Sequence, residues 1–354
     1  MTSRTLSFLG LAAVFVLALA LWLAYPRSTD QKPTLLYPGL KEELSQVSMI
    51  RIFKAGDVPA IELTRSESQW QLAQRSNYPA DSAKVRRLLQ ALADARPTEE
   101  KTSNPDNYAA LGVEDIADTS ATGVRIELSG PRQAVNLIVG KNAGMKGSYV
   151  RRAGEATSWL TSESIDASAL AHDWLRNSVI DISADRIQSA TISIGNDRPY
   201  TVAKAARADA DFKAEDLPRG KEADTFAANN VATALAGLTL ADVRPAQDFA
   251  ADKPIASATF RTFDGLVVDL DGWSKDGKHY VTARTTQDDA LAQRFHVDAK
   301  EIATTGDEGS TAAAAKPASD TAGAINARLQ GWAYEIADYK YEAIFKPATA
   351  VIKK

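Results

Sequence analysis

The feature that most constrains the fold is an internal repeat at an offset of 142 residues. Residues 46–52 (QVSMIRI) resemble residues 188–194 (QSATISI), and both segments alternate apolar and polar side chains as half-buried strands do. Trp70 then matches the aromatic Phe212 at the same offset. An amphipathic sheet must bury one face, so a repeat of this kind predicts two similar units in tandem.

The repeat continues through a predicted helix and a predicted meander of strands. Val85, Leu88, Leu89 and Leu92 recur at helical spacing in the first copy. The further matches are 90–92 with 233–235, 124–130 with 258–265, 135–139 with 266–270, Tyr149-Val150 with Tyr280-Val281, and Trp159-Leu160 with the strand at 332–336. Alternating strands that run into glycine turns predict antiparallel hairpins in both copies.

The predicted fold class is α+β: an N-terminal transmembrane helix followed by two tandem, similar units, each an antiparallel meander sheet with packed helices. The first unit spans 44–181 and the second spans 185–354. Each copy closes with a stretch of helical pattern, around 166–178 in the first and around 338–352 in the second. We therefore expect a helix at the end of each unit.

Local signals refine this outline. Asp81 precedes the first long helical pattern, where an N-cap is expected. Residues 102–112 (TSNPDNYAALG) predict a turn, a short helix from Pro105 and a glycine stop. The second unit has a flexible insertion at about 286–330, and within it residues 303–324 are low in bulky apolar side chains, which predicts a mobile loop.

The N-terminus predicts a membrane anchor. Residues 6–24 (LSFLGLAAVFVLALALWLA) carry no charge and would span roughly 28 Å as a helix, close to the ~30 Å hydrocarbon core of a bilayer. A cleaved signal peptide is the alternative, with Ala18-Leu19-Ala20 as its cleavage pattern. Because the apolar run continues beyond this point, we expect residues 1–25 to be an uncleaved anchor in the lipid bilayer and the proline-containing residues 26–43 to be a stalk.

Composition excludes several kinds of chemistry. The chain has no Cys, which removes disulfides, Cys-ligated zinc, iron–sulfur clusters and Cys nucleophiles. Its net charge of −4 argues against nucleic-acid binding, which needs a basic surface. The three His, at 172, 279 and 296, are scattered, and no G-x-S-x-G nucleophile elbow is present. We therefore predict no catalytic residue, no metal and no cofactor.

One basic loop is a candidate for partner binding. Residues 140–148 (GKNAGMKGS) are rich in Gly and Lys but lack the order of a phosphate-binding loop, so a hairpin loop is expected. The cations Lys141, Lys146, Arg151 and Arg152 would cluster near this hairpin. Such a patch could bind an anionic polymer or an acidic partner, and a solvated loop without a partner is the alternative.

Two further patterns have structural alternatives. Asp269-Leu270-Asp271-Gly272 begins like a calcium loop but lacks the later ligands, so turns are favoured. The tryptophans could line a sugar-binding face or fill the core; they are Trp70, Trp159, Trp174, Trp273 and Trp332. A sugar-binding face would indicate a cell-envelope binding module for polysaccharide or peptidoglycan, and burial of Trp159 and Trp273 would count against it. An envelope hydrolase would need acidic residues that converge in a pocket.

The first copy carries motifs that resemble a known family. They are Trp70, Asn77-Tyr78-Pro79-Ala80-Asp81, Val85, Leu88-Leu89, Leu92, Lys101-Thr102-Ser103-Asn104-Pro105, Asn107-Tyr108, Leu111-Gly112-Val113, Val139-Gly140-Lys141, Tyr149-Val150-Arg151-Arg152 and Trp159. As a set they resemble a bacterial family catalogued as domain of unknown function 4340. The resemblance covers about 45–180 well and the second copy more loosely.

The resemblance implies a location and a partner. Members of that family look like single-anchor proteins of the bacterial inner membrane with a periplasmic body, often associated with an ABC-type export system. Their partners resemble the auxiliary component of the gliding-motility transporter. We therefore expect a non-enzymatic, membrane-anchored periplasmic accessory protein that contacts a permease or auxiliary subunit of an ABC-type transporter. The family contributes no established catalytic residues.

Overall fold

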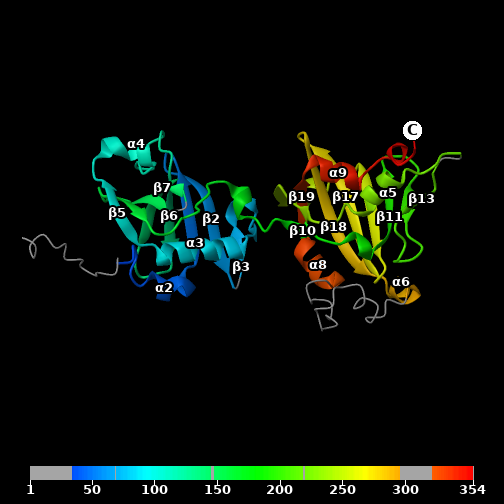
Figure 1. Cartoon of the computed structure of the whole chain (residues 1–354), viewed down its shortest axis with the longest axis horizontal. Coiled ribbons are helices and arrows are strands. Elements are labelled where there is room, and N and C mark those ends of the chain that lie inside the picture. The colour runs from blue at the N-terminus through cyan, green and yellow to red at the C-terminus, as the bar shows by residue number, and fades with distance from the viewer. Residues whose placement is uncertain (1–33, 68, 145–146, 218–219, 296–320, 354) are drawn as a thin grey trace, which may run out of the picture.

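The computed structural model of the chain describes residues 34–67, 69–144, 147–217, 220–295 and 321–353. It has a mixed α+β fold with two large antiparallel sheets, which lie in two lobes along the longest axis of the molecule (Figure 1). The predicted α+β class is confirmed at this level. Among the described residues, no helix is long and apolar enough to cross a membrane, and the predicted anchor at 6–24 lies outside them.

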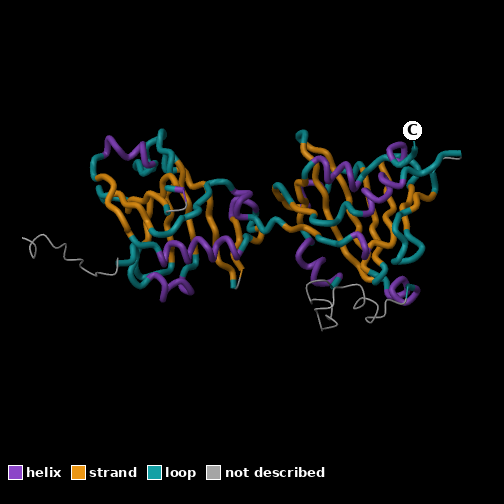
Figure 2. Tube along the Cα trace, viewed as in Figure 1, coloured by secondary structure: helices purple, strands orange, loops and turns teal. Residues whose placement is uncertain are grey.

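The first sheet has nine strands in the order β4-β3-β2-β1-β6-β7-β8-β9-β5. The strands are β1 (Met49–Lys54), β2 (Val58–Ser66), β3 (Gln69–Leu72), β4 (Tyr78–Pro79), β5 (Pro97–Thr102), β6 (Val124–Ser129), β7 (Val135–Asn142), β8 (Ser148–Arg152) and β9 (Ser158–Thr161). The helices of this lobe are α2 (Leu40–Glu43), α3 (Ser82–Asp94) and α4 (Tyr108–Leu111). Figure 2 shows α3 lying across one face of the sheet.

The second sheet has eight strands in the order β13-β12-β11-β16-β17-β18-β19-β15. The strands are β11 (Ile187–Ile194), β12 (Tyr200–Ala203), β13 (Lys213–Glu215), β15 (Asp242–Pro245), β16 (Ala256–Thr262), β17 (Leu266–Lys275), β18 (Lys278–Gln287) and β19 (Trp332–Ile336). The helices are α5 (Thr225–Ala232), α6 (Asp289–Arg294), α8 (Ala322–Leu329) and α9 (Asp338–Ile344). A separate ladder joins β10 (Ser178–Ile180) to β14 (Leu238–Thr239).

The two sheets have the same strand order once β4 is set aside. The matches read from the sequence fall on strands at equivalent places. Trp70 lies in β3 and Phe212 lies directly before β13, while Tyr149 lies in β8 and Tyr280 lies in β18. In both lobes the segment after the edge strand, β5 or β15, crosses the sheet face opposite the main core. It contributes the buried ring of Tyr108 in the first lobe and that of Phe249 in the second.

Helix α3 forms where the apolar spacing predicts it. The Asp81 carboxylate accepts hydrogen bonds from the backbone N–H groups of Ala83 at 2.9 Å and Lys84 at 3.0 Å, so it caps the helix. The apolar stripe is fully buried and consists of Val85, Leu88, Leu89 and Leu92. One connected cluster of buried apolar residues runs from this stripe through both lobes.

The predicted closing helix at 166–178 is wrong. The structure has only a 3₁₀ turn at Ala171–Trp174. The Ser168 hydroxyl bonds the Asp173 carboxylate and accepts from the backbone N–H of Leu170, and such local bonds compete with a helical backbone. In the second unit α9 ends at Ile344, and Pro347 follows, which disfavours a continuous helix to residue 352.

Two other expectations are corrected at segment ends. Residues 34–43, assigned to the stalk, instead pack onto the first unit, because Leu36, Tyr37 and Leu40 are buried in the main core. Residues 26–33 lie outside the described residues. Within the insertion at 286–330, α6 and α8 are helical, so the last residues of the predicted loop at 303–324 belong to a helix.

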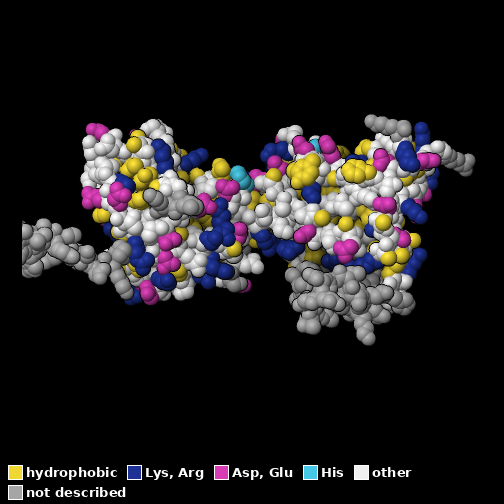
Figure 3. Space-filling model, in the orientation of Figure 1, with side chains coloured by type: hydrophobic (Ala, Val, Ile, Leu, Met, Phe, Trp, Pro, Cys, Tyr) yellow, Lys and Arg dark blue, Asp and Glu magenta, His cyan; other side chains and the backbone are white. Residues whose placement is uncertain are grey.

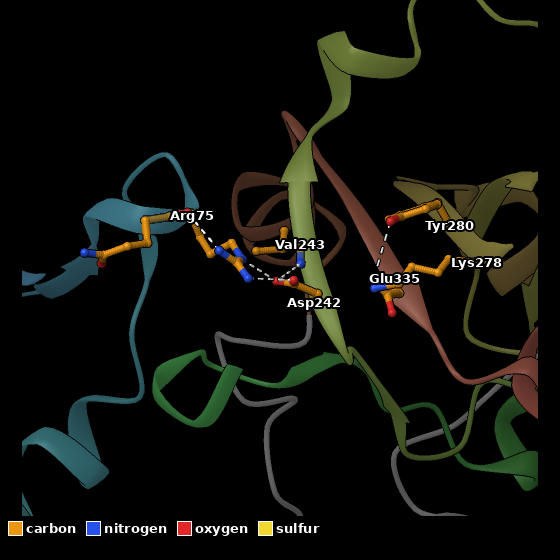
Figure 4. A network of polar contacts seen from close by, with 7 residues as sticks. Arg75, Asp242, Val243, Lys278, Tyr280 and Glu335 are labelled. Carbon is orange, nitrogen blue, oxygen red and sulfur yellow. Dashed lines mark hydrogen bonds and ion pairs between the residues drawn. The ribbon is translucent and has the colours of Figure 1, made fainter. Parts of the chain in front are cut away.

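The two lobes meet at a contact that we call the joint. Arg75, after β3, forms a bidentate ion pair with Asp242 at the start of β15, at 2.5 and 2.8 Å (Figure 4). The Tyr78 ring of β4 packs edge-on against the Trp332 ring of β19 at 5.0 Å and lies 6.3 Å from the Tyr334 ring. The joint therefore combines a paired charge with aromatic packing.

Candidate functional site

A cleft of about 410 Å³ opens on the first unit, on the sheet face opposite α3. We call it the acidic cleft; its lining residues are Pro105, Tyr108, Glu114, Asp115, Asp118, Arg151, Gly154, Glu155 and Ala156. One wall is the segment 105–118 and the other is the turn between β8 and β9. This segment contains several of the motifs that the sequence singles out.

The segment 105–118 folds as its sequence predicts. The Asn104 side chain accepts from the backbone N–H of Asp106 at 3.1 Å, and Pro105 starts the first helical turn. Helix α4 then ends at Gly112, whose φ of +74° lies in the left-handed region that favours glycine. The predicted turn, short helix and glycine stop are confirmed.

Arg151 forms the floor of the acidic cleft. Its side chain is only 3 % exposed, and its guanidinium donates to the carbonyl oxygens of Val113 at 2.8 Å and Glu155 at 2.9 Å. It also donates to the Asp115 carboxylate at 2.7 Å and lies 4.5 Å from the centre of the Tyr108 ring. These contacts link both walls of the cleft to β8, so Arg151 holds the two walls in place.

Two further motif residues fasten the same wall. The Lys141 ammonium donates to the carbonyl oxygens of Ala109 at 3.3 Å and Ala110 at 3.0 Å, which caps the C-terminal end of α4. The Tyr108 hydroxyl donates across the cleft to the Ala156 carbonyl. Lys141, Tyr108 and Arg151 thus all donate to backbone carbonyls, and the Arg151 guanidinium also lies over the Tyr108 ring.

Glycines allow the segment to lie close to the sheet. A Cβ atom added at Gly140, in β7, would lie 2.3 Å from the Leu111 carbonyl oxygen and 2.7 Å from that of Gly112. A Cβ atom at Gly123 would lie 2.2 Å from the same Gly112 oxygen. The motifs Leu111-Gly112-Val113 and Val139-Gly140-Lys141 therefore meet in space, which explains why both sequences contain glycine at the contact.

The charge of the cleft is predominantly negative. Four acidic residues, Glu114, Asp115, Asp118 and Glu155, line the cleft together with Arg151. The Asp115 carboxylate pairs with Arg151 at 2.7 Å, and the Glu155 carboxylate pairs with Arg152 at 3.4 Å. Hydrogen bonds from the backbone N–H and the hydroxyl of Ser120 lower the pKa of Asp118, so this group stays ionised. One oxygen of Glu114 is buried and has no hydrogen-bond partner among the described residues. The arrangement suits a cationic group.

The four cations predicted as a patch are divided by the sheet. Arg151 and Arg152 are consecutive in β8, so their side chains leave on opposite faces. Arg152 lies 5.4 Å from the centre of the Tyr37 ring and donates to the Leu36 carbonyl, on the face of the main core. Lys141 caps α4 on the other face, and Lys146 lies outside the described residues. The described members do not form one continuous cationic surface.

The tryptophans considered for a sugar-binding face contribute to the cores. Trp273 is 9 % exposed and packs against Phe249, and Trp159 is partly buried against the main core. Trp70 and Trp174 are buried, and Trp332 packs on Tyr78 at the joint. Burial of Trp273 counts against the aromatic face expected for a polysaccharide-binding module, whereas Trp159 stays partly exposed.

The turns favoured for Asp269-Leu270-Asp271-Gly272 are wrong, because these residues lie within β17 and pair with both β16 and β18. Asp269 accepts from the Thr259 hydroxyl at 2.8 Å and pairs with Arg284 at 3.5 Å. Asp271 has a raised pKa because it is partly buried and lies near Asp269. Within the described ranges, no group of three or more His, Cys, Asp or Glu side chains could hold a metal ion.

Sequence reasoning identified the Lys and Arg residues of this region but missed the carboxylates of the acidic cleft. Three of these carboxylates follow the glycine stop at Gly112, namely Glu114, Asp115 and Asp118, and the fourth, Glu155, follows β8. No regular spacing in the sequence therefore predicts that they line one cleft. The available signal was the concentration of family motifs on both sides of the cleft.

Comparison with known proteins gives a family but no relative of known function. The family model described as domain of unknown function (DUF4340) matches residues 70–256, more than half of the chain. This range contains the whole acidic cleft and, at the joint, the Arg75–Asp242 ion pair and Tyr78. No curated protein and no solved structure matches the chain. The chain belongs to the family described as domain of unknown function (DUF4340).

Proposed function

We propose that the chain is a non-enzymatic accessory protein whose acidic cleft binds a basic segment of a partner protein. The supporting observation is the use of the motif side chains around the cleft. Arg151, Lys141 and Tyr108 all donate to backbone carbonyls and so maintain the shape of the cleft. Among the described residues the Glu114 and Asp118 carboxylates of the cleft form no ion pair, so their charges are available to attract cations.

We propose further that this partner is a permease or auxiliary subunit of an ABC-type transport system. The support is the family resemblance together with the apolar segment at 6–24, which would hold the chain as a single-pass protein in the bacterial inner membrane. In this arrangement the body lies in the periplasm, beside the partner. A cationic juxtamembrane or loop segment of the permease would enter the acidic cleft.

We infer that the units 44–181 and 185–354 arose by duplication of one unit. Their common strand order and the ordered sequence matches support this. The two copies differ where the acidic cleft lies, because the connection after β5 runs from 103 to 123 whereas that after β15 runs only from 246 to 255. In this proposal the longer connection specialises the first unit for binding.

Charge removal at the cleft tests the proposed function. The variant Glu114→Gln/Glu155→Gln keeps side-chain shape and removes two negative charges from the lining of the cleft. The control Glu100→Gln/Glu215→Gln removes two exposed charges from β5 and β13, outside the cleft. Each full chain is extracted from membranes in mild detergent and purified, and retained permease or ATPase is identified by mass spectrometry. We expect the cleft variant to lose the transporter and the control to keep it.

Retention of the transporter by both variants, or by neither, would contradict the role of the cleft. If the wild-type chain retains no transport component under mild extraction, the proposed partner itself is wrong. Protease treatment of intact spheroplasts tests the topology separately. A body that is digested without lysis supports periplasmic exposure, and a body protected until lysis contradicts it.

A further inference from the structure

The chain enters the first unit only a short distance after the predicted membrane anchor. Leu36 is already buried in the main core, and its backbone N–H donates to the Ala95 carbonyl at 2.7 Å, directly after α3. Twelve residue steps separate Ala24, the last residue of the apolar segment, from Leu36, and an extended chain covers at most about 43 Å over that number. The anchor, which is part of the proposed function, would therefore hold the C-terminal end of α3 beside a bilayer.

The side of α3 that faces solvent is basic. Arg86, Arg87 and Arg96 are exposed, and none of the three forms an ion pair among the described residues. At 1.5 Å per residue, Arg87 lies about 12 Å along the helix from Ala95, where the chain enters, and Arg96 directly follows Ala95. Lys and Arg side chains gather over α3 in the space-filling view (Figure 3). We call the surface formed by α2, the exposed side of α3 and Arg96 the α3 face.

The acidic side chains on and beside the α3 face are mostly paired. The Asp94 carboxylate pairs with Lys41 at 2.8 Å, and the Asp166 carboxylate pairs with Lys84 at 3.5 Å. Glu42 is the acidic residue of α2 and α3 that forms no ion pair among the described residues. Three unpaired guanidiniums therefore face one unpaired carboxylate, and the net charge of the α3 face is positive.

We propose that the α3 face docks on an anionic lipid surface. Exposed basic side chains are attracted to anionic headgroups, and guanidiniums present paired donors to lipid phosphates. The short connection from the anchor keeps this face within reach of the bilayer. Figure 1 shows α2 and α3 on the side of the first lobe opposite α4, so the acidic cleft points away from the bilayer. A loop of the permease that extends beyond the membrane surface would then reach the cleft.

A site-specific fluorescence measurement tests this orientation. The chain has no Cys, so Gln90→Cys on the α3 face and Thr119→Cys on the opposite sheet face each provide one labelling site at an exposed residue. Each labelled full chain is inserted into nanodiscs of phosphatidylcholine, with or without phosphatidylglycerol, that carry a nitroxide quencher on lipid headgroups. We expect phosphatidylglycerol to increase quenching of the probe at residue 90, while the probe at residue 119 stays weakly quenched in both kinds of disc.

Charge removal and salt provide the controls. Arg86→Gln/Arg87→Gln removes two cations that each strengthen attraction to an anionic surface by about fivefold, so quenching at residue 90 should fall toward its value in phosphatidylcholine. Arg198→Gln/Lys213→Gln removes the same charge near the outer edge strand of the second unit and should leave this quenching unchanged. Salt at about 1 M should act on the wild type as the first variant does, because it shortens the Debye length to about 3 Å.

Several results would overturn the proposal. One is equal quenching at residues 90 and 119, and another is quenching at residue 90 that is independent of phosphatidylglycerol. A probe at residue 90 that is shielded when transporter components co-purify would assign the α3 face to a protein partner instead. A chain that does not float with the nanodiscs would show that the anchor itself is wrong, and the orientation would fail with it. A stable anchor without docking would reject the orientation alone, since co-purification judges the acidic cleft separately.

Discussion

Replacement of Gly140 by Ala tests whether close backbone packing seats one wall of the acidic cleft. The added Cβ would lie 2.3 Å from the Leu111 oxygen. Carbon and oxygen normally approach to about 3.3–3.6 Å, so the two chains must separate by about 1 Å. The obstructing atoms are backbone oxygens of α4 and its cap, so the whole segment must move. The φ of Gly140 is outside the left-handed region, so backbone conformation adds no strain.

The expected cost follows from that clash. Overpacking of a well-packed contact costs about 1–3 kcal/mol, and a displaced segment would also weaken the bonds from Lys141 and Arg151, each worth about 1 kcal/mol. We therefore expect Gly140→Ala to lower the free energy of unfolding of the first unit by about 2–3 kcal/mol. For a unit of this size the melting temperature should fall by about 5–10 °C.

Thermal unfolding of the full chain, followed by circular dichroism and tryptophan fluorescence, measures this loss. Gly323→Ala is the matched control, because no atom of the described residues lies within 4 Å of a Cβ at Gly323 and the residue is in α8, where Ala is the better helix former. The control should melt at or slightly above the wild-type temperature. A Gly140→Ala chain that melts within about 1 °C of wild type would refute the packing argument, since the clash would then be relieved without loss.

Three further substitutions test the cap, the joint and the cleft. Asp81→Ala should destabilise the chain by about 1 kcal/mol through loss of the α3 cap, measured by urea unfolding, and an unchanged midpoint would contradict that role. At Asp242 burial raises the pKa, but the hydrogen bond from Arg75 outweighs it and the net shift is downward, so the stabilisation is present above about pH 4 and is lost as the pH falls through the lowered value. Asp242→Asn should therefore flatten the dependence of melting temperature on pH below pH 4, and an unaltered pH profile would contradict this. Tyr108→Phe should cost about 1 kcal/mol by removing the bond to Ala156, and calorimetry that finds no change in melting temperature would argue against that bond.

The sequence predicts the paired meanders well because their signal is local. Period-two alternation in β1, β6 and β16 reflects one buried face, and burial alternates along these strands in the structure. The edge strands β5 (PTEEKT) and β15 (DVRP) have no such pattern, since charged residues and proline are common at sheet edges. Only pairing with β9 and β19 identifies them as strands.

The site is harder to predict than the strands, for two physical reasons. The carboxylates of the acidic cleft meet only because a glycine contact seats one segment on another, and such a contact leaves no periodic signal. The predicted cationic patch, by contrast, conflicts with the alternation of side chains along a strand, which is the same rule that predicts the strands. Alternation along a strand places Arg151 and Arg152 on opposite faces, so proximity in sequence does not produce one patch here.

The joint gives the tandem arrangement a structural purpose. An antiparallel sheet exposes unpaired N–H and C=O groups at both edges, which favours association with other strands. Here the strap at 174–180 bonds to the first sheet at Pro79 and Ala80 and joins the second lobe through β10 and β14. The inner edges of the two sheets thus face the joint, and the outer edges are the charged strand β5 and the short strand β13. A single unit would expose the edge that its partner unit covers, so the tandem arrangement protects the inner edges of both sheets from pairing with other strands.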